Sequence, residues 1–210
     1  MLFDLKEFSP SQVYHLMTQT VIPRPIAWIL SENETKASSS NDRYNLAPFS
    51  YFNAVCSQPP LLMISVGKKP EGDTKDTARN LTLGAKCVVH IAQEAQAAAV
   101  TQSAATLAYG ESELNSLELS LCEQDNFALP KLHECPIAFN CEVYELKTIG
   151  DAAQQLIFLK ILSINVDESV LEIDDKGRTN VSANMVQPLA RLGANQYSGI
   201  SNILDLKRPK

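Results

Sequence analysis

The chain has 210 residues, of which 45% are apolar and 20% are charged. This composition excludes a disordered or fibrous protein and is typical of one globular domain, which we expect to span residues 1–210 with its core at about 10–200. The 18 basic and 24 acidic side chains give a net charge of −6. Because binding to phosphates needs clustered Lys and Arg, nucleic acid is not expected as a partner.

Nothing in the sequence predicts a membrane span or an export signal. The longest apolar runs, such as 61–64 and 156–159, are far shorter than the roughly 20 residues that cross a bilayer. Residues 1–10 carry charges and no apolar signal region, so a cytoplasmic protein is expected. The five Cys form no C-x-x-C pair and the three His are scattered, which favours reduced thiols and predicts no metal site.

The chain begins with a short amphipathic helix and continues mainly as strands. Ser9 is a suitable N-cap, Pro10 is favoured in a first turn, and apolar residues follow at helical spacing. Strands are indicated by short apolar or alternating runs at residues 26–30, 46–55, 61–66, 86–92, 137–143, 156–166 and 170–173, the last followed by a turn at 174–177.

Three more helices and one long loop interrupt these strands. Polar residues throughout 31–45 predict an exposed loop between partner strands, and Lys207, Arg208 and Lys210 predict a frayed C-terminal tail. Without regular βαβ alternation, the elements favour an antiparallel barrel or sheet with helical insertions. The helices are expected at 78–83, at the alanine-rich 93–108 and at 112–121.

The segment 45–53 places Pro48 inside an aromatic run that otherwise reads as a strand. Proline cannot donate to a strand ladder, so the backbone has to bulge or leave the sheet there. A bulge with short polar side chains beside apolar surface suits a planar, hydrogen-bonding aromatic ligand. The alternative is an ordinary edge strand that packs Phe49 and Phe52 into the core.

The segment Lys75-Asp76-Thr77 opens one of the expected helices. Backbone N–H groups at a helix start, one hydroxyl and one or two cations together bind a phosphate dianion well. Lys75 and Thr77 provide two of these groups. The alternative is an ordinary capped helix with Thr74 or Asp76 as its N-cap and a solvated lysine.

These two segments and several others, in this order, resemble the flavin reductase-like, FMN-binding split-barrel family. The resemblance covers roughly residues 10–200 and depends on several blocks of adjacent residues, not on one motif. The blocks are residues 21–28, 45–53, 59–61, 75–77 with Asn80, 110–114, 135–137, 188–193 and Tyr197.

The resemblance implies a mainly β fold with helical insertions, a six-stranded antiparallel split barrel that forms a homodimer with one FMN per subunit. The segment 47–53 would lie along the isoalloxazine ring, Lys75 and Thr77 would hold the phosphate, and Asp76 would order the turn. The implied cofactor-binding residues are Arg24, Asn45, Ala47, Pro48, Phe49, Ser50, Asn53, Ser65, Lys75, Asp76, Thr77, Arg191 and Tyr197.

The implied reaction is hydride transfer from NAD(P)H to flavin N5, with electrons passed to free flavin, a small-molecule acceptor or a partner monooxygenase. Because a hydride moves between two stacked rings, no catalytic acid or base and no metal is predicted. Two alternatives stay open: an FMN-bound electron carrier or small-molecule reductase without nicotinamide turnover, and a non-enzymatic FMN-binding module. A related oxidase of phosphorylated B6 vitamers is less favoured, because its substrate-clamping basic residues are not apparent.

The sequence departs from the family pattern at two places. Many relatives carry a glycine where Arg43-Tyr44 stands, and the polar loop 31–45 before it borders the expected pocket. Substrate access and the choice between NADH and NADPH therefore stay open. His90 lies where relatives often carry Asn, and a hydrogen-bonded strand histidine is favoured there over a proton donor in the pocket.

Overall fold

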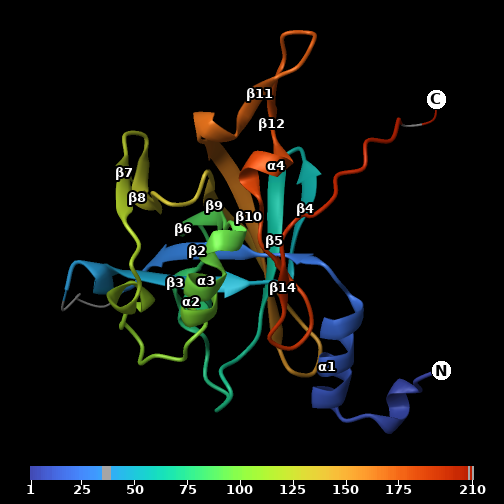
Figure 1. The fold of residues 1–210 in the computed structure, drawn as a ribbon. Coiled ribbons are helices and arrows are strands. Elements are labelled where there is room, and N and C mark those ends of the chain that lie inside the picture. The colour runs from blue at the N-terminus through green and yellow to red at the C-terminus, as the bar shows by residue number, and fades with distance from the viewer. Residues whose placement is uncertain (35–38, 208, 210) are drawn as a thin grey trace.

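The structure is a computed structural model that describes residues 1–34, 39–207 and 209. A seven-stranded antiparallel sheet with short helices around it dominates the fold (Figure 1). The strands are β2 (Ala27–Glu32), β3 (Tyr44–Phe49), β4 (Phe52–Ser57), β5 (Pro60–Val66), β6 (Lys86–Ile91), β9 (Ile137–Ile149) and β10 (Gln154–Val166). Their order in the sheet is β3-β2-β6-β9-β10-β5-β4.

The two edge strands of this sheet, β3 and β4, follow each other directly in the chain. Only Ser50 and Tyr51 lie between them, so the opposite edges are within reach of a two-residue connection and the sheet curls into a barrel. The Tyr51 carbonyl accepts a hydrogen bond from the Ser65 N–H at 2.9 Å, which holds this corner on β5. Pro48 lies on the edge strand β3 and pairs with Trp28 of β2. An edge strand tolerates a residue without an N–H.

The strand count differs from the six strands expected of the barrel. The expected strand at 46–55 is divided at residues 50–51 into β3 and β4, which pair at opposite edges of the sheet. The other five strands of the sheet lie where the sequence predicts them, with β9 and β10 longer than expected. The predicted class, mainly β with helical insertions, is confirmed.

The central strand β2 is buried on both faces. Trp28 and Leu30 pack into one apolar cluster on the first face. Ala27 and Ile29, on the other face, pack into a second cluster inside the barrel. The first cluster is covered by α3 (Ala97–Gln102) and by the hairpin of β7 (Leu121–Gln124) and β8 (Phe127–Leu132). A near-continuous apolar strand is expected of this double burial.

The first helix forms as predicted. In α1 (Pro10–Thr20) the Ser9 hydroxyl accepts from the Gln12 N–H, and the Gln12 side chain accepts from the Ser9 N–H. This reciprocal capping box satisfies two backbone groups at the helix start. Figure 1 shows α1 beside the barrel, next to the N-terminal segment.

The alanine-rich helix is much shorter than predicted. Of residues 93–108, only η3 (Glu94–Gln96) and α3 are helical. The Ser103 hydroxyl donates to the Val100 carbonyl at 3.0 Å and accepts from the Trp28 indole N–H at 2.8 Å, so α3 ends there. Contact with the sheet overrides the high helix propensity of the alanines that follow.

Two further helix predictions need correction. Residues 112–121 form only the 3-10 turn η4 (Glu113–Ser116) before β7 begins at Leu121. The expected helix at 78–83 is α2 (Asp76–Asn80), which begins two residues earlier. It ends at Asn80, whose amide donates to Ser31 Oγ at 3.1 Å and Asn33 Oδ1 at 2.9 Å. These side-chain bonds attach α2 to the end of β2.

The predicted loop 31–45 is shorter than expected, because Ser31 and Glu32 extend β2 and Tyr44 and Asn45 begin β3. The Asn33 N–H donates to the Arg43 carbonyl at 2.8 Å, which continues the pairing beyond the strands. Residues 35–38 of this loop lie outside the described residues, as do Arg208 and Lys210 of the predicted tail.

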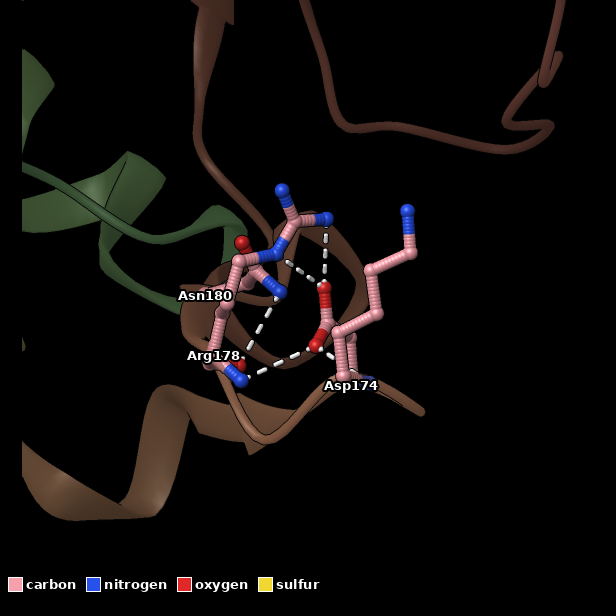
Figure 2. Close-up of polar contacts among 4 residues, drawn as sticks. Asp174, Arg178 and Asn180 are labelled. Atoms are coloured by element: carbon pink, nitrogen blue, oxygen red, sulfur yellow. Dashed lines mark hydrogen bonds and ion pairs between the residues drawn. The ribbon is translucent and has the colours of Figure 1, made fainter.

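The predicted strand and turn near 170–177 are confirmed. Asp174 accepts from the N–H groups of Lys176 and Arg178, both at 2.9 Å, and pairs with the Arg178 guanidinium at 2.6 Å (Figure 2). The turn joins β11 (Leu171–Ile173) to β12 (Thr179–Val181). The remaining elements are η1 (Leu5–Glu7), η2 (Asn41–Arg43), η5 (Glu168–Val170), α4 (Ala183–Val186) and the small sheet β1 (Arg24–Pro25), β13 (Ala190–Arg191) and β14 (Tyr197–Ser198).

Neither a membrane-spanning helix nor a cluster of metal-binding side chains occurs among the described residues. No helix in this part of the chain is long and apolar enough to cross a membrane. The same residues contain no group of three or more His, Cys, Asp or Glu side chains arranged for a metal ion.

His90 is a structural histidine of β6. Its side chain is fully buried, its Nδ1 lies 3.0 Å from the Trp28 carbonyl, and its Nε2 accepts from the Leu132 N–H at 3.0 Å. Since Nε2 accepts, the proton is on Nδ1 and the ring is neutral. Burial lowers the pKa of His90 to about 4. The strand-histidine interpretation is therefore correct, and His90 faces no pocket described below.

We predict that His90 makes the fold sensitive to acid. Its folded pKa of about 4 lies below the ordinary 6.5, so its contribution is complete above pH 6.5 and is lost as the pH falls toward 4. His90→Asn should remove about 2 kcal/mol of the decrease in unfolding free energy between pH 7 and 4.5, measured by urea unfolding. The control is His133→Gln, at an exposed histidine, which should lose as much unfolding free energy between pH 7 and 4.5 as the wild type. If His90→Asn also lost as much as the wild type, the assignment of the acid sensitivity to His90 would be contradicted.

Candidate functional site

Three neighbouring clefts have Pro48 in their walls. We call them the α2 cleft, the β5 cleft and the β13 cleft, after the second element that lines each of them. Because Pro48 stands just before the chain leaves one sheet edge for the other, the three clefts meet at the corner that closes the barrel.

The α2 cleft lies between β3, α2 and the irregular segment 103–107 that follows α3. The Asn45 amide donates to Thr77 Oγ1 at 2.9 Å, which attaches α2 to β3. The Lys69 ammonium pairs with Asp76 at 2.8 Å and so holds the preceding loop against the same helix. The polar and aromatic walls are formed by Asn45, Phe49, Lys69, Lys75, Asp76, Thr77 and Glu113, and Ala47 lies among them.

Lys75 is the cation of this cleft that lacks an anionic partner. Its side chain is half-buried, and its Nζ lies 5.8 Å from the centre of the Phe49 ring. Within residues 1–34, 39–207 and 209, its ammonium has neither an ion pair nor a hydrogen bond. Burial and the nearby charge of Lys69 lower its pKa. A half-buried, uncompensated ammonium favours an anion beside it.

Glu113 lies in the same cleft and was not among the residues expected to bind. Its side chain is buried, and Oε2 accepts from the Leu46 N–H at 2.9 Å, which fixes the first half of β3. Burial raises the pKa of Glu113 to about 7, and the Asp76 charge adds to this effect. The block 110–114 contains Glu113, but only the tertiary contact with β3 distinguishes it from the neighbouring acidic residues.

The β5 cleft brings Ser50 and Ser65 together with Lys75. The Ser65 hydroxyl accepts from the Gln154 amide at 2.9 Å, so β10 orients it. Tyr14 of α1 also reaches this cleft, and the sequence did not indicate its involvement.

The β13 cleft brings Ser50 together with Arg191 and Tyr197. The Arg191 guanidinium lies over the Tyr197 ring, 4.4 Å from its centre. Tyr14 of α1 lines this cleft too. The expected residues Arg191 and Tyr197 are therefore brought to the corner, but in a different cleft from Lys75 and Thr77.

Two expected residues line none of the three clefts. Arg24 is 5% exposed, and its guanidinium donates to the Val21 carbonyl at 2.6 Å and the Leu192 carbonyl at 2.7 Å. Its Nε also donates to Ser50 Oγ at 3.4 Å, so Arg24 orients a residue that lines two of the clefts without lining them itself. Asn53 is exposed on β4, beyond the corner.

The corner offers an apolar wall at Pro48 and Phe49, hydroxyl and amide groups beside it, and cations at both ends. These groups fit a flat ring that carries an anionic chain, because the ring needs apolar contact with a few polar partners and the anion needs a cation. Lys75, with no partner in the described part of the chain, is the group whose charge such an anion would neutralise.

Comparisons with known proteins agree with this chemistry. Residues 17–180 match the family model of the flavin reductase like domain. The uncharacterised protein YwrF of Bacillus subtilis is 34% identical over 212 residues, which cover 99% of this chain and 98% of YwrF.

Solved structures are similar over the whole length. Nitrilotriacetate monooxygenase component B from Bacillus cereus gives a TM-score of 0.85 at 30% identity and covers 98% of both chains. The 2-nitrobenzoate 2-nitroreductase NbaA from Pseudomonas fluorescens gives a TM-score of 0.83 at 27% identity and covers 100% of this chain and 96% of that chain. The chain therefore belongs to the flavin reductase-like family, whose split-barrel fold it shares.

Proposed function

We propose that the protein is an FMN-dependent oxidoreductase that takes a hydride from NAD(P)H and passes the electrons to free flavin or to a small-molecule acceptor. The observation that carries this proposal is the corner at Pro48, where an apolar wall, polar groups and Lys75, which has no partner among the described residues, line three clefts that share Pro48. Family membership supports a flavin-binding oxidoreductase.

In this proposal the isoalloxazine ring of FMN lies along residues 47–50 of β3, with its phosphate on Lys75 and Thr77. The backbone N–H groups of Phe49 and Ser50 and the side chains of Asn45 and Ser50 are its candidate polar partners. When bound, the flavin supplies a ring whose N5 accepts a hydride, while the protein supplies stacking, hydrogen-bond donors and exclusion of water.

The charges of the α2 cleft support a phosphate at this position. Lys69 is already neutralised by Asp76, whereas Lys75 is not, so a phosphate dianion would add the missing partner of one ammonium. Glu113, with a pKa of about 7, is only partly ionised at neutral pH, which limits its repulsion of an anion in the same cleft.

The first test is whether the protein binds and turns over flavin. The purified protein should be yellow or take up FMN, and NADH or NADPH should bleach the visible flavin absorption without oxygen and then reduce added free FMN repeatedly. Bleaching by dithionite but by neither nicotinamide would favour the electron-carrier alternative. A preparation that takes up no FMN would overturn the proposal.

The second test concerns the phosphate contact. Lys75→Ala should weaken FMN binding by about 1 to 3 kcal/mol, because one charge-assisted hydrogen bond is lost. Riboflavin has no phosphate, so its affinity should be nearly unchanged; both are measured by quenching of flavin fluorescence. Lys176→Ala, in the distant turn after β11, is the matched control and should bind FMN like the wild type. Unchanged FMN affinity in Lys75→Ala would place the phosphate elsewhere.

We also propose a homodimer. Large exposed apolar side chains occur on the edge strand β4 and along the antiparallel pair of β9 and β10, and exposed apolar sheet surface favours association. They are Val55, Tyr144, Leu146, Ile149, Leu162 and Ile164.

Light scattering on the purified protein should give twice the monomer mass of 23.1 kDa. Leu162→Glu should increase the monomer fraction, because a carboxylate would be desolvated in the interface. Thr179→Glu, on the exposed strand β12, reports the effect of an added charge alone. A monomeric mass for the wild-type protein at micromolar concentration would contradict the dimer.

A reducing, cytoplasmic setting also belongs to the proposal. The cysteines Cys56, Cys87, Cys122, Cys135 and Cys141 are free thiols. Free thiols persist in the cytoplasm, whereas secreted proteins commonly pair them.

A further inference from the structure

Two arginines face each other across the small sheet beside the β13 cleft. Arg24 of β1 and Arg191 of β13 are direct partners in the antiparallel register. Neither has a carboxylate partner within the described part of the chain. Like charges at directly opposite positions are unfavourable, so this end of the barrel carries uncompensated positive charge.

The two arginines differ in how their N–H groups are used. Arg24 is buried and donates to three backbone carbonyls, those of Thr18, Val21 and Leu192. Arg191 donates to one, the Ala194 carbonyl. Since a guanidinium has five N–H donors, Arg191 keeps donors that no described residue of this chain takes up. It is therefore the arginine available to a ligand.

Arg191 is also held in place before any ligand binds. Its guanidinium stacks on the Tyr197 ring at 4.4 Å, and the Thr101 hydroxyl lies 3.1 Å from the Tyr197 hydroxyl and so orients that ring. A guanidinium fixed by stacking loses little conformational entropy when an anion binds to its free edge.

The walls of the β13 cleft suit an aromatic anion. Among the described residues that line it, Arg191 carries the sole formal charge, in contrast to the α2 cleft, which has two lysines and two carboxylates. No lysine and no second arginine from the described part of the chain lines the cleft, so it matches a single carboxylate better than a diphosphate. The remaining wall residues are the apolar or aromatic Tyr14, Ile26, Pro48, Val100, Ala104 and Tyr197, and the polar Ser50, Thr101 and Asn195.

We propose that the β13 cleft binds a small planar aromatic carboxylate, with the carboxylate on Arg191 and the ring against the apolar wall next to Pro48. The position of this ligand beside the cofactor depends on the flavin site proposed above, since the cleft shares Pro48 and Ser50 with the proposed ring position. Arg191 is then the residue that selects anionic over neutral partners.

Benzoate and benzamide test this selection, because they have nearly the same shape and differ in charge. Calorimetric titration of the FMN-loaded protein should give benzoate an affinity roughly tenfold or more above that of benzamide. Arg191→Met should bring the ratio close to one, and Arg191→Lys, which keeps the charge without the planar fork, should give an intermediate ratio. Arg178→Met, at the turn drawn in Figure 2, should leave the ratio unchanged.

Three results would overturn the proposal. The wild-type protein could bind the two compounds equally, a comparison that does not depend on the folding of any variant. Arg191→Met could keep the wild-type ratio. Arg191→Met could weaken FMN but not riboflavin, which would assign Arg191 to the cofactor phosphate. Uptake of FMN is measured separately by absorption, and the same titrations on flavin-free protein show whether the cleft binds benzoate even if the flavin assignment fails.

Discussion

The fold depends on a constraint at Pro48, which has no N–H and so can pair only at a sheet edge. Two residues after Pro48 the chain leaves β3, and it returns at the opposite edge as β4. That short connection closes the barrel. Near the corner, β3 remains an edge strand with no further strand paired to its outer side in the described sheet. The three clefts meet at this place because the backbone there is no longer covered by a neighbouring strand.

Charge divides the corner into two environments. In the α2 cleft two lysines and two carboxylates lie together, and burial, with a smaller effect of the neighbouring charges, lowers the pKa of Lys75 and raises that of Glu113. In the β13 cleft, as far as the described residues form it, Arg191 is the one charged group among apolar and neutral polar side chains. The anionic end of a flat ligand would therefore meet both cations and carboxylates in the α2 cleft but a single cation in the β13 cleft, although Pro48 lines both.

Local signals in the sequence predicted much of the fold, and distant contacts account for most of the errors. The Ser9 cap and the positions of six strands follow from neighbouring residues. The end of α3 at Ser103 does not, because it depends on Trp28, 75 positions away. Likewise, Glu113 fixes the Leu46 N–H across 67 positions. Alanine content and leucine spacing carry no information about such partners, so both helices were predicted too long.

The candidate site also depends on distant contacts that local sequence signals do not predict. Lys75 and Thr77 were expected at the phosphate and Asn45 at the polar edge of the ring, and the α2 cleft contains all three. Arg24 and Arg191 were expected in the same role, yet backbone carbonyls occupy the first guanidinium and leave most of the second free. Two arginines at one register position thus act as a structural clamp and as an open anion site. The distinction depends on which carbonyls surround each one, and only the folded chain determines that.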